Sequence, residues 1–437
     1  MQYCFRIFGC QMNYADSERV KSVLAESDWE ETTELEQADA ILLFTCSVRQ
    51  KAEDKVFGLL QDLQKWKARS DKRRIGLTGC MVRQTSSQAD PKRDSLLKRS
   101  DVLDFVWRIE DSKKLPKLLL ATGNSQLVTG NSRLVTGNYF SIRPYYKNKF
   151  SVFVPISTGC DNYCSYCIVP YARGREISRS EKEILKECQQ AVENSAQEIT
   201  LLGQNVNSYQ KKKGAFAKLL AKVAKISKLK RIRFISSHPK DFDETVIDVM
   251  ATNANIERHL HLPAQHGDNS ILKKMNRNYT AGQYLKLVEK FRQKLSEASV
   301  TTDFIVGFPE ETEKQFENLL KFYREASFDF AFFAKYSPRP GTAAAKLSDD
   351  VSRSQKSERW NRLNDLMIAT TTKKYAALKN KVLEVLVESC RNGECAGRSS
   401  EFYLTKFKGK KDLVGKMVKA KITQTREVEL IGEIIEN

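Results

Sequence analysis

Three cysteines separated by three and then two residues constrain this chain more than any other feature of its sequence. Cys160, Cys164 and Cys167 follow directly on the apolar run 152–156, so a buried strand is expected to lead into a short loop that carries three thiols. Thiolates are the soft ligands that proteins give to iron-sulfur clusters. Three of them leave one iron of a 4Fe-4S cluster without a protein ligand. The spacing therefore predicts a cluster with one iron free to bind a substrate or cofactor.

The alternatives for these three cysteines are a zinc knuckle and buried, unreactive thiols. A structural zinc site needs four ligands, so a second cysteine or histidine pair would have to lie nearby in the sequence. The nearest cysteine is Cys188, which stands alone in a helical segment and is expected to pack as a small hydrophobic residue. Both alternatives are weaker than the cluster.

An aromatic residue, Tyr166, stands directly before the last of the three cysteines. The motif from Cys160 to Cys167 resembles the signature of radical S-adenosylmethionine (SAM) enzymes. The resemblance implies that the free iron chelates the methionine part of SAM and that Tyr166 lies close to this cofactor.

Length, charge and cysteine use limit the class of protein. A chain of 437 residues is expected to form two to four domains. It has no apolar run of 18 residues, and the polar Gln11-Met12-Asn13 follows the first ten residues, so we expect no membrane contact, no signal peptide and a cytoplasmic protein. Its scattered cysteines fit a reducing compartment. The formal net charge of +19 indicates an anionic macromolecule as partner, although charge could also serve solubility alone.

The first hundred residues predict a parallel sheet with a cysteine after each of three strands. The carboxyl ends of parallel strands meet at one edge, so Cys10, Cys46 and Cys80 are expected to converge on a second three-thiolate site. Without the resemblance described next, small buried residues at strand ends would be an equally good interpretation. The expected strands are 3–8, 40–44 and 74–78, and the expected helices are 16–27 and 52–67.

The sequences around these cysteines resemble the N-terminal domain of the methylthiotransferases, a family of radical SAM enzymes. The matching segments are Gly9-Cys10-Gln11-Met12-Asn13, Thr45-Cys46-Ser47-Val48-Arg49 and Gly79-Cys80-Met81. The resemblance implies that Cys10, Cys46 and Cys80 hold an auxiliary 4Fe-4S cluster. Cys4 has no counterpart in the family pattern, so we expect it in the core.

Between residues 150 and 340, six apolar runs alternate with helical patterns, as in a parallel βα architecture. The resemblance implies the partial (β/α)6 barrel of radical SAM enzymes, with the cysteine loop at the carboxyl face of the first strand. The turn-rich segment 118–148, with a near repeat over 126–139, is expected to be a linker. The six runs are 152–156, 198–202, 232–235, 259–262, 302–306 and 330–335.

Several strand ends of this region match positions where the family binds SAM and substrate. The resemblance implies that Tyr166, Gln204, Asn205, Ser237 and Asp303 contact SAM. Arg173, Arg175 and Arg179 follow the cysteine loop, where they could bind a carboxylate or phosphate or lie in solvent. Two motifs depart from the family: Gln265-His266-Gly267-Asp268 replaces Gln-Ser-Gly-Ser, and Pro309-Glu310-Glu311-Thr312 replaces Pro-Gly-Glu-Thr.

After a charged helical segment at 352–379, short apolar runs predict a small antiparallel β-barrel. Nine basic and two acidic residues lie between Arg398 and Arg426, with Phe402, Tyr403 and Phe407 among them. Basic groups can bind phosphates and aromatic rings can stack on unpaired bases, although the rings could equally be core residues. The segment resembles the RNA-binding TRAM domain. Cys390 and Cys395 are expected in its first loop, with no assigned role.

Taken together, the resemblance implies a mixed α/β protein with four segments. These are a Rossmann-like methylthiotransferase domain at 1–117, the linker at 118–148, a radical SAM core at 149–378 and a TRAM-like domain at 379–437. The motifs are most similar to members that add a methylthio group to carbon 2 of N6-isopentenyladenosine beside the tRNA anticodon. The alternatives within the family are threonylcarbamoyladenosine in tRNA and an aspartate of a ribosomal protein.

The resemblance also implies the cofactors and partners. They are two 4Fe-4S clusters, SAM as methyl donor and radical source, the tRNA anticodon stem-loop, and a flavodoxin or ferredoxin-type reductant. We expect a monomer. Two alternatives come from other classes of protein: a non-catalytic iron-sulfur protein that binds RNA, and a zinc-dependent RNA-modifying enzyme.

Overall fold

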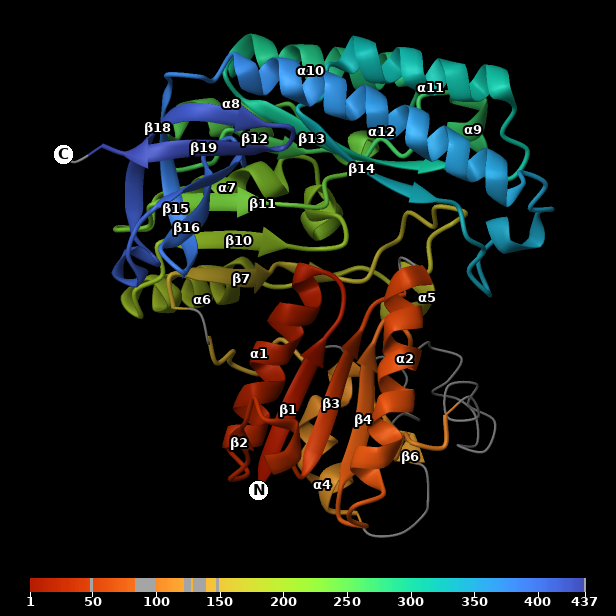
Figure 1. The fold of residues 1–437 in the computed structure, drawn as a ribbon, viewed down its shortest axis with the longest axis vertical. Helices are drawn as coiled ribbons and strands as arrows, with labels where there is room; N and C mark the ends of the chain where they lie inside the picture. The colour runs from red at the N-terminus through yellow and green to blue at the C-terminus, as the bar shows by residue number, and fades with distance from the viewer. Residues whose placement is uncertain (48–49, 83–99, 122–126, 129–138, 147–148, 436–437) are drawn as a thin grey trace.

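The computed structural model describes residues 1–47, 50–82, 100–121, 127–128, 139–146 and 149–435. Three parts follow one another along the chain. In Figure 1 an N-terminal α/β domain (red to orange) lies below a central half-barrel of strands and helices (yellow to cyan), and a small β-barrel (blue) covers one end of the central strands. The predicted fold class is confirmed.

The N-terminal sheet is parallel throughout and, in the described part of the chain, has the strand order β2-β1-β3-β4-β5-β6. Its central strand β3 is buried along its whole length. The predicted strands and helices are present as β1 (Gln2–Ile7), α1 (Gln11–Ala25), β3 (Ala40–Thr45), α2 (Gln50–Lys67) and β4 (Arg74–Gly79). Three strands of two residues were not predicted: β2 (Glu30–Glu31), β5 (Phe105–Val106) and β6 (Leu127–Val128).

Part of the segment predicted as a linker belongs to this domain. Helix α4 (Leu115–Leu120) packs on the domain, β6 extends its sheet, and Tyr139 lies in its core. Most of the near repeat at 126–139 lies outside the described residues. The domain limits at 117, 148 and 378 stay predictions.

The central region holds the six predicted parallel strands. They form two three-stranded sheets, β7-β10-β11 and β12-β13-β14, which are joined by a single bridge between Ile232 and Ile256. Alternate strand residues face a layer of helices and form the largest apolar core, so the other residues face the barrel interior. The strands are β7 (Ser151–Pro155), β10 (Glu198–Leu202), β11 (Arg231–Phe234), β12 (His259–His261), β13 (Ser299–Val306) and β14 (Phe330–Lys335).

The helices around this half-barrel begin at residues that cap them. A serine or threonine side chain accepts a hydrogen bond from the third helical N–H, and the glutamate or glutamine at that position bonds back, in four of these helices. The capped helices are α6 (Glu181–Glu193), α10 (Ala281–Lys294), α11 (Glu313–Ala326) and α12 (Arg353–Ala376). Within the described part of the chain, every helix is too short or too polar to span a lipid bilayer.

The C-terminal domain is a closed barrel with the strand order β15-β16-β17-β19-β18. The prediction of a wholly antiparallel barrel is wrong in one pair, because β17 and β19 run parallel. The apolar runs expected as strands were 382–387, 401–407, 416–423 and 427–435, so β16 was missed, because its glycine, serine and cysteine residues resemble a turn. The strands are β15 (Val382–Arg391), β16 (Glu394–Ser399), β17 (Leu404–Lys408), β18 (Met417–Arg426) and β19 (Glu429–Ile434).

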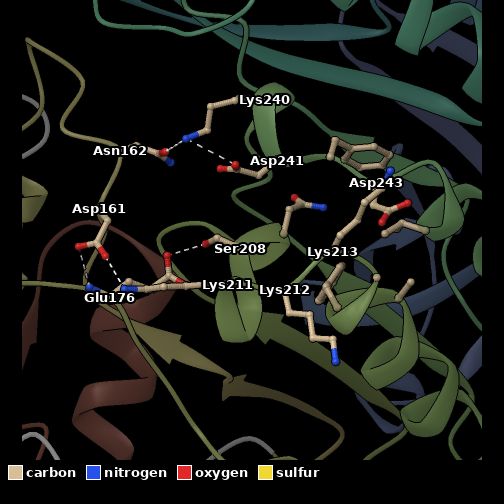
Figure 2. Close-up of a pocket in the computed structure, with 16 residues that line it drawn as sticks. Asp161, Asn162, Glu176, Ser208, Lys211, Lys212, Lys213, Lys240, Asp241 and Asp243 are labelled. Carbon is tan, nitrogen blue, oxygen red and sulfur yellow. Dashed lines mark hydrogen bonds and ion pairs between the residues drawn. The ribbon is translucent and has the colours of Figure 1, made fainter.

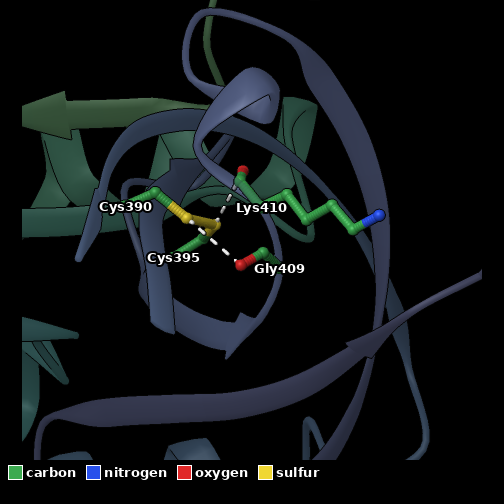
Figure 3. Close-up of a disulfide and its surroundings, with 4 residues drawn as sticks. All are labelled: Cys390, Cys395, Gly409 and Lys410. Atoms are coloured by element: carbon green, nitrogen blue, oxygen red, sulfur yellow. Dashed lines mark hydrogen bonds between the residues drawn. A yellow bond between two sulfur atoms is a disulfide. The ribbon is translucent and has the colours of Figure 1, made fainter. Parts of the chain in front are cut away.

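Cys390 and Cys395 lie in facing strands and not in a loop as predicted. They are paired across the β15–β16 hairpin with Cα atoms 4.0 Å apart and form a disulfide. Figure 3 shows their sulfur atoms beside the carbonyl oxygens of Gly409 and Lys410. Directly opposite positions in an antiparallel hairpin bring cysteine side chains within bonding reach. The prediction placed both cysteines in a loop and assigned them no role, so it did not consider this pairing.

The C-terminal domain closes the amino end of the central barrel. Arg231 donates to the carbonyl of Arg398 at 2.8 Å, and Arg233 donates to the carbonyl of Ser399 at 2.9 Å. The Phe402 ring stacks on His259 with ring centres 4.5 Å apart. The prediction that the aromatic residues of this domain stack on RNA bases is therefore not supported for the rings it named. Tyr403 and Phe407 lie in the domain core, and Phe402 packs against the barrel.

Candidate functional site

The loop that carries Cys160, Cys164 and Cys167 is held by main-chain hydrogen bonds. It leaves the strand pair β8 (Ser157–Thr158) and β9 (Ile177–Ser178) at Gly159, whose φ is +78°. A side chain at Gly159 would collide with the carbonyl of Arg175, so only glycine fits there. The Cys160 N–H donates to the Gly174 carbonyl at 3.1 Å, and the Cys167 N–H donates to the Cys164 carbonyl at 2.9 Å. The three thiols are thus displayed by a compact, defined loop.

Burial dominates the acid–base properties of the Cys160 and Cys167 thiols. It raises the pKa of Cys160 to about 11 and also raises the pKa of Cys167. The Cys164 sulfur lies 3.7 Å from Nη1 of the buried Arg277. Thiols with a raised pKa stay protonated at neutral pH, whereas iron ligation requires thiolates. The positive charge of the irons in a bound cluster would therefore have to stabilise the Cys160 and Cys167 thiolates.

Cys10, Cys46 and Cys80 follow β1, β3 and β4 at the carboxyl edge of the N-terminal sheet. The side chains of Cys10 and Cys46 are hydrogen-bonded to each other. Burial raises the pKa of Cys80, and the nearby Cys10 raises it further. The hydrogen bond with Cys46, together with the Arg173 guanidinium, lowers the pKa of Cys10 to about 6. A Cβ atom at Gly9 would lie 2.2 Å from Cys46 Cβ, so this approach requires glycine.

The two cysteine groups face one another across the domain interface. The charge of Cys80 in the N-terminal domain contributes to the raised pKa of Cys167 in the central loop. Arg173, at the end of α5 (Val169–Arg173), donates to Asp16 at 2.7 Å and Asn13 at 3.1 Å on α1. Figure 1 shows β1, β3 and β4 running towards the central barrel, so their carboxyl ends meet it.

A buried charge cluster fixes this arrangement. Glu187 of α6 binds Arg19 of α1 and Arg179 of the segment after β9, each at 2.9 Å. Tyr146 also donates to Glu187 at 2.8 Å. Arg173 forms a structural ion pair between domains, and Arg179 shares Glu187 with Arg19 of the N-terminal domain, so neither is the solvent-exposed or phosphate-binding group considered above. Arg175 is exposed and pairs with Asp161.

Among the residues that the structure describes, no three cysteine, histidine or carboxylate side chains are close enough to hold one metal ion. Ligands of a single zinc ion lie about 2.3 Å from it if they are sulfurs, and hence close to one another. A cubic cluster binds each thiolate through a different iron and therefore separates its ligands more widely. The donor set, three cysteines at each site, fits iron-sulfur clusters better than zinc.

Unpartnered polar atoms mark the strand ends beside the central cysteine loop. Gln204 Oε1, Asn205 Oδ1 and Ser237 Oγ are buried without a hydrogen-bond partner. Buried polar atoms are almost always paired, so these three acceptors and donors suit a bound polar ligand such as SAM. His238 Nε2 is unpartnered in the same way. The resemblance placed His238 in one strand-end motif with Ser237, but only Ser237 was chosen as a SAM contact.

The other two residues expected to contact SAM are placed differently. Tyr166 packs in an apolar cluster with Phe308 and Tyr336. Asp303 lies on the inner face of β13, where its Oδ2 is 3.0 Å from Nε2 of His261. His261 in turn lies 2.9 Å from the Thr301 hydroxyl. Asp303 is thus part of a polar row inside the barrel, whereas Gln204 and Asn205 follow β10 and Ser237 follows β11, in the other three-stranded sheet.

The two motifs that depart from the family contact each other. His266 is fully buried, with Nε2 3.5 Å from Oε2 of the buried Glu311. Glu311 also accepts hydrogen bonds from the N–H groups of Gly307 and Phe308 and pairs with Arg359. Glu311, which matches the family motif, therefore holds the turn after β13 from within, together with the substituted His266. The substituted Glu310 lies on the surface of this turn with a φ of +61°.

A cavity of about 560 Å³ lies between the three parts of the molecule. Gly9 and Gln11, on either side of Cys10, form one wall, and Arg398 and Phe402 of the C-terminal domain form another. The barrel contributes the inner faces of its first three strands through Phe153, Thr200 and Ile235. Such a volume accommodates a nucleoside.

Family models match along most of the chain. They are "Uncharacterized protein family UPF0004" at residues 2–106, "Radical SAM superfamily" at 154–323 and "TRAM domain" at 376–435. The chain is 41% identical to the tRNA-2-methylthio-N(6)-dimethylallyladenosine synthase of Shouchella clausii, over 99% of this chain and 84% of that protein. It is 39% identical to the Bacillus subtilis protein of the same name, over 99% of this chain and 86% of that one.

Solved structures share the fold at low sequence identity. The radical SAM methyltransferase TsrM from Kitasatospora setae aligns with a TM-score of 0.57 and 13% identity, over 79% of this chain and 75% of that one. The cobalamin-dependent radical SAM enzyme OxsB aligns with a TM-score of 0.51 and 12% identity, over 84% and 56%. At this identity the likeness extends to the fold alone.

Proposed function

This chain belongs to the family of tRNA-2-methylthio-N(6)-dimethylallyladenosine synthases, and we propose that it adds a methylthio group to carbon 2 of N6-isopentenyladenosine beside the tRNA anticodon. It is a radical SAM transferase, and its cofactors are SAM and 4Fe-4S clusters. The observation that supports the proposal best is the convergence of two cysteine groups, one from each domain, across an interface fixed by Arg173.

The residues present suggest how the cofactors are held. We assign one cluster to Cys160, Cys164 and Cys167 and the other to Cys10, Cys46 and Cys80. When bound, the cofactors supply a radical at the first cluster and the methylthio group at the second. The unpartnered atoms of Gln204, Asn205 and Ser237 would bind the polar groups of SAM. Asp303, held by His261, and Tyr166 would complete the cofactor site from β13 and the cysteine loop.

The protein's own part is to orient the substrate and exclude water. The cavity beside Cys10, which the inner faces of the first barrel strands also line, would receive the target adenine. Phe402 and the C-terminal domain close the barrel at its amino end, which keeps solvent from that side. Lysines on the outer surface of the C-terminal barrel, such as Lys408, Lys410 and Lys419, would bind RNA phosphates. We further propose a monomeric cytoplasmic enzyme that receives electrons from a flavodoxin or ferredoxin-type protein.

The test is a reaction of anaerobically reconstituted protein with SAM, a reductant and tRNA that carries N6-isopentenyladenosine. Mass spectrometry of the digested tRNA should reveal 2-methylthio-N6-isopentenyladenosine. tRNA that carries threonylcarbamoyladenosine serves as the comparison. Product only from the second tRNA, or only from a ribosomal protein, would overturn the choice of substrate. If no SAM is cleaved, the assignment as an enzyme is contradicted and a protein that only binds RNA is favoured.

A further inference from the structure

A second cavity of about 560 Å³ borders the central cysteine loop and shares no lining residue with the first. One wall is the loop itself, through Asp161 and Asn162. The facing walls are the turn after β10, which includes residues 207–214, and the turn after β11, which includes residues 240–243. Figure 2 shows Lys240 reaching from the second turn to Asn162, with Ser208 and Glu176 in contact below it.

The rim of this cavity offers several cationic groups. Lys211, Lys212, Lys213 and Lys240 all line it. Lys211 pairs with Asp161 at 2.6 Å, whereas Lys212 has no ion-pair partner among the described residues. The ten-residue helix α7 (Ala215–Ala224) begins here, and its N-cap, Gly214, provides no side chain to satisfy the first N–H groups. Lysines beside an uncapped helix N-terminus favour a phosphate group.

Two buried side chains in the wall have polar atoms without a hydrogen-bond partner. Asn207 is 8% exposed, and both its Nδ2 and its Oδ1 have no hydrogen bond. Glu176 is equally buried. Its Oε2 accepts from the Ser208 hydroxyl at 2.6 Å, but its Oε1 is unpartnered. A carboxamide offers a donor and an acceptor side by side, which complements the edge of a base with an exocyclic amino group next to a ring nitrogen. Phe216 and Phe242 supply apolar surface beside them.

We propose that this cavity binds an unpaired nucleotide of the RNA loop that contains the target adenosine. The inference rests on the proposed function. The lysines and the α7 N-terminus hold phosphates, and Asn207 with Glu176 binds a base that carries an amino group, so adenine or cytosine is favoured over uracil. The four lysines are matched by Asp161, Glu176, Asp241 and Asp243. A concave site with no excess charge and buried unpaired amide atoms fits a nucleotide better than the surface of an acidic protein.

The phosphate part is tested with the double variant Lys212→Ala, Lys213→Ala. Its affinity for an isopentenylated anticodon stem-loop should fall several-fold, and the slope of log K against log salt should flatten by about 1.4, which is roughly 0.7 for each lost phosphate contact. The matched control is Lys218→Ala, Lys225→Ala, which removes two exposed lysines of the α7 segment outside the cavity. The control should bind as the wild type does, and equal losses in both variants would overturn the proposal.

The base part is tested with Asn207→Ala and with stem-loops in which each nucleotide flanking the target is changed to uridine. One of these changes should weaken binding to the wild type about five-fold or more, as for loss of one bidentate base contact. The Asn207→Ala variant should bind that uridine-substituted stem-loop and the unsubstituted stem-loop with equal affinity. Formation of 5′-deoxyadenosine without RNA should be unchanged in every variant, which shows that the fold and the SAM site are intact.

Other outcomes contradict the inference. If the wild type binds the uridine-substituted stem-loops as tightly as the unsubstituted one, the cavity does not recognise a base. If the lysine variant binds RNA normally but is reduced more slowly by a flavodoxin-type protein, the cavity serves the reductant instead. Neither result affects the proposed function, which fails only if the wild type makes no methylthiolated adenosine. The two failures are therefore distinguishable.

Discussion

Arg173 connects the two cysteine groups more directly than any other side chain. Its guanidinium contacts Asn13 and Asp16 and lies within electrostatic range of Cys10 and Cys80. It is almost fully buried, as is Asp16. A buried ion pair is weak evidence for stability, but removal of one partner leaves the other charge uncompensated. The arginine therefore positions the N-terminal domain on the central loop.

Arg173→Met should lower the free energy of unfolding by about 3–5 kcal/mol, because Asp16 would remain buried without its partner. Urea denaturation measures this change. Methylthio transfer should also fall further than 5′-deoxyadenosine formation, because the cysteine groups would lose their fixed separation. Arg175→Met is the control, since its exposed pair with Asp161 should contribute at most about 1 kcal/mol. Equal effects of the two substitutions would remove Arg173 from this role.

Glu310 occupies the left-handed region, with φ at +61°, at a position where the family usually has glycine. Glu310→Gly should therefore raise the free energy of unfolding by up to about 1 kcal/mol, because an L-residue pays roughly 1–2 kcal/mol in this conformation. The gain is reduced by loss of the exposed ion pair with Lys274. Glu310→Ala should give no such gain, and stabilisation by alanine as large as by glycine would contradict the explanation.

At this scale the sequence predicted that Cys160, Cys164 and Cys167 share one short loop after a buried strand, and the structure has that loop. Their role as cluster ligands stays a prediction. The buried ion pairs of Asp16 and Glu187 were not predicted, because a charged residue on a helix is usually exposed. Phe402 was misassigned because basic and aromatic residues alternate in the same way in an RNA-binding surface and in a strand with an apolar inner face.

Helices α1 and α6 meet through one buried carboxylate, Glu187. Burial alone would raise its pKa, but Arg19 and Arg179 outweigh that effect and lower it. A carboxyl group with a lowered pKa in the folded state stabilises the fold above its unfolded pKa. That contribution is lost as the pH falls through the folded value. The contact between the N-terminal domain and the barrel is therefore expected to weaken in acid.

Glu187→Gln should cost about 3–5 kcal/mol at pH 7, since two buried arginines would lose their counterion. The difference between the variant and the wild type should shrink as the pH falls below about 4.3, the ordinary glutamate pKa of the unfolded chain, and it should be lost as the pH falls through the lowered pKa of Glu187 in the folded protein. Urea unfolding of both proteins at several pH values provides the measurement. Glu183→Gln on the exposed face of α6 is the control, and a difference that is independent of pH would contradict the assignment.

Elements with clear periodicity were predicted to within a few residues, as β10 and β14 illustrate. The strands that were missed are those in which periodicity cannot be measured. β2, β5 and β6 have two residues each, and β16 contains the small residues typical of turns. Whether these short segments form strands depends on contacts with neighbouring strands of the sheet, and the local sequence pattern carries no information about those contacts.

On the scale of the whole molecule, both ends of the central barrel are covered. The N-terminal domain lies at the carboxyl ends of the strands, and the C-terminal barrel closes the amino ends through Arg231, Arg233 and Phe402. The domain types were predictable from motifs. Their mutual placement was not, because it depends on buried pairs such as Arg233 with Ser399, whose partners are 166 residues apart.

Two clusters are expected to serve one reaction, in which SAM cleavage at the central cysteine loop precedes methylthio transfer at the N-terminal cysteines. Two 4Fe-4S clusters correspond to about eight irons per chain in anaerobically reconstituted protein, and Cys164→Ala should lower this to about four. An unchanged iron content in that variant would remove Cys164 from the ligands. The same variant should form no 5′-deoxyadenosine.

The most direct test is to measure 5′-deoxyadenosine and methylthiolated nucleoside together in the triple variant Cys10→Ala, Cys46→Ala, Cys80→Ala, with isopentenylated tRNA as substrate. The central cysteine loop is intact in this variant, so SAM should still be cleaved and 5′-deoxyadenosine should form. Methylthio transfer should be absent, because the ligands of the second cluster are gone. Methylthiolated tRNA from this variant would contradict the account, and Cys10, Cys46 and Cys80 would then be packing residues at the ends of three strands.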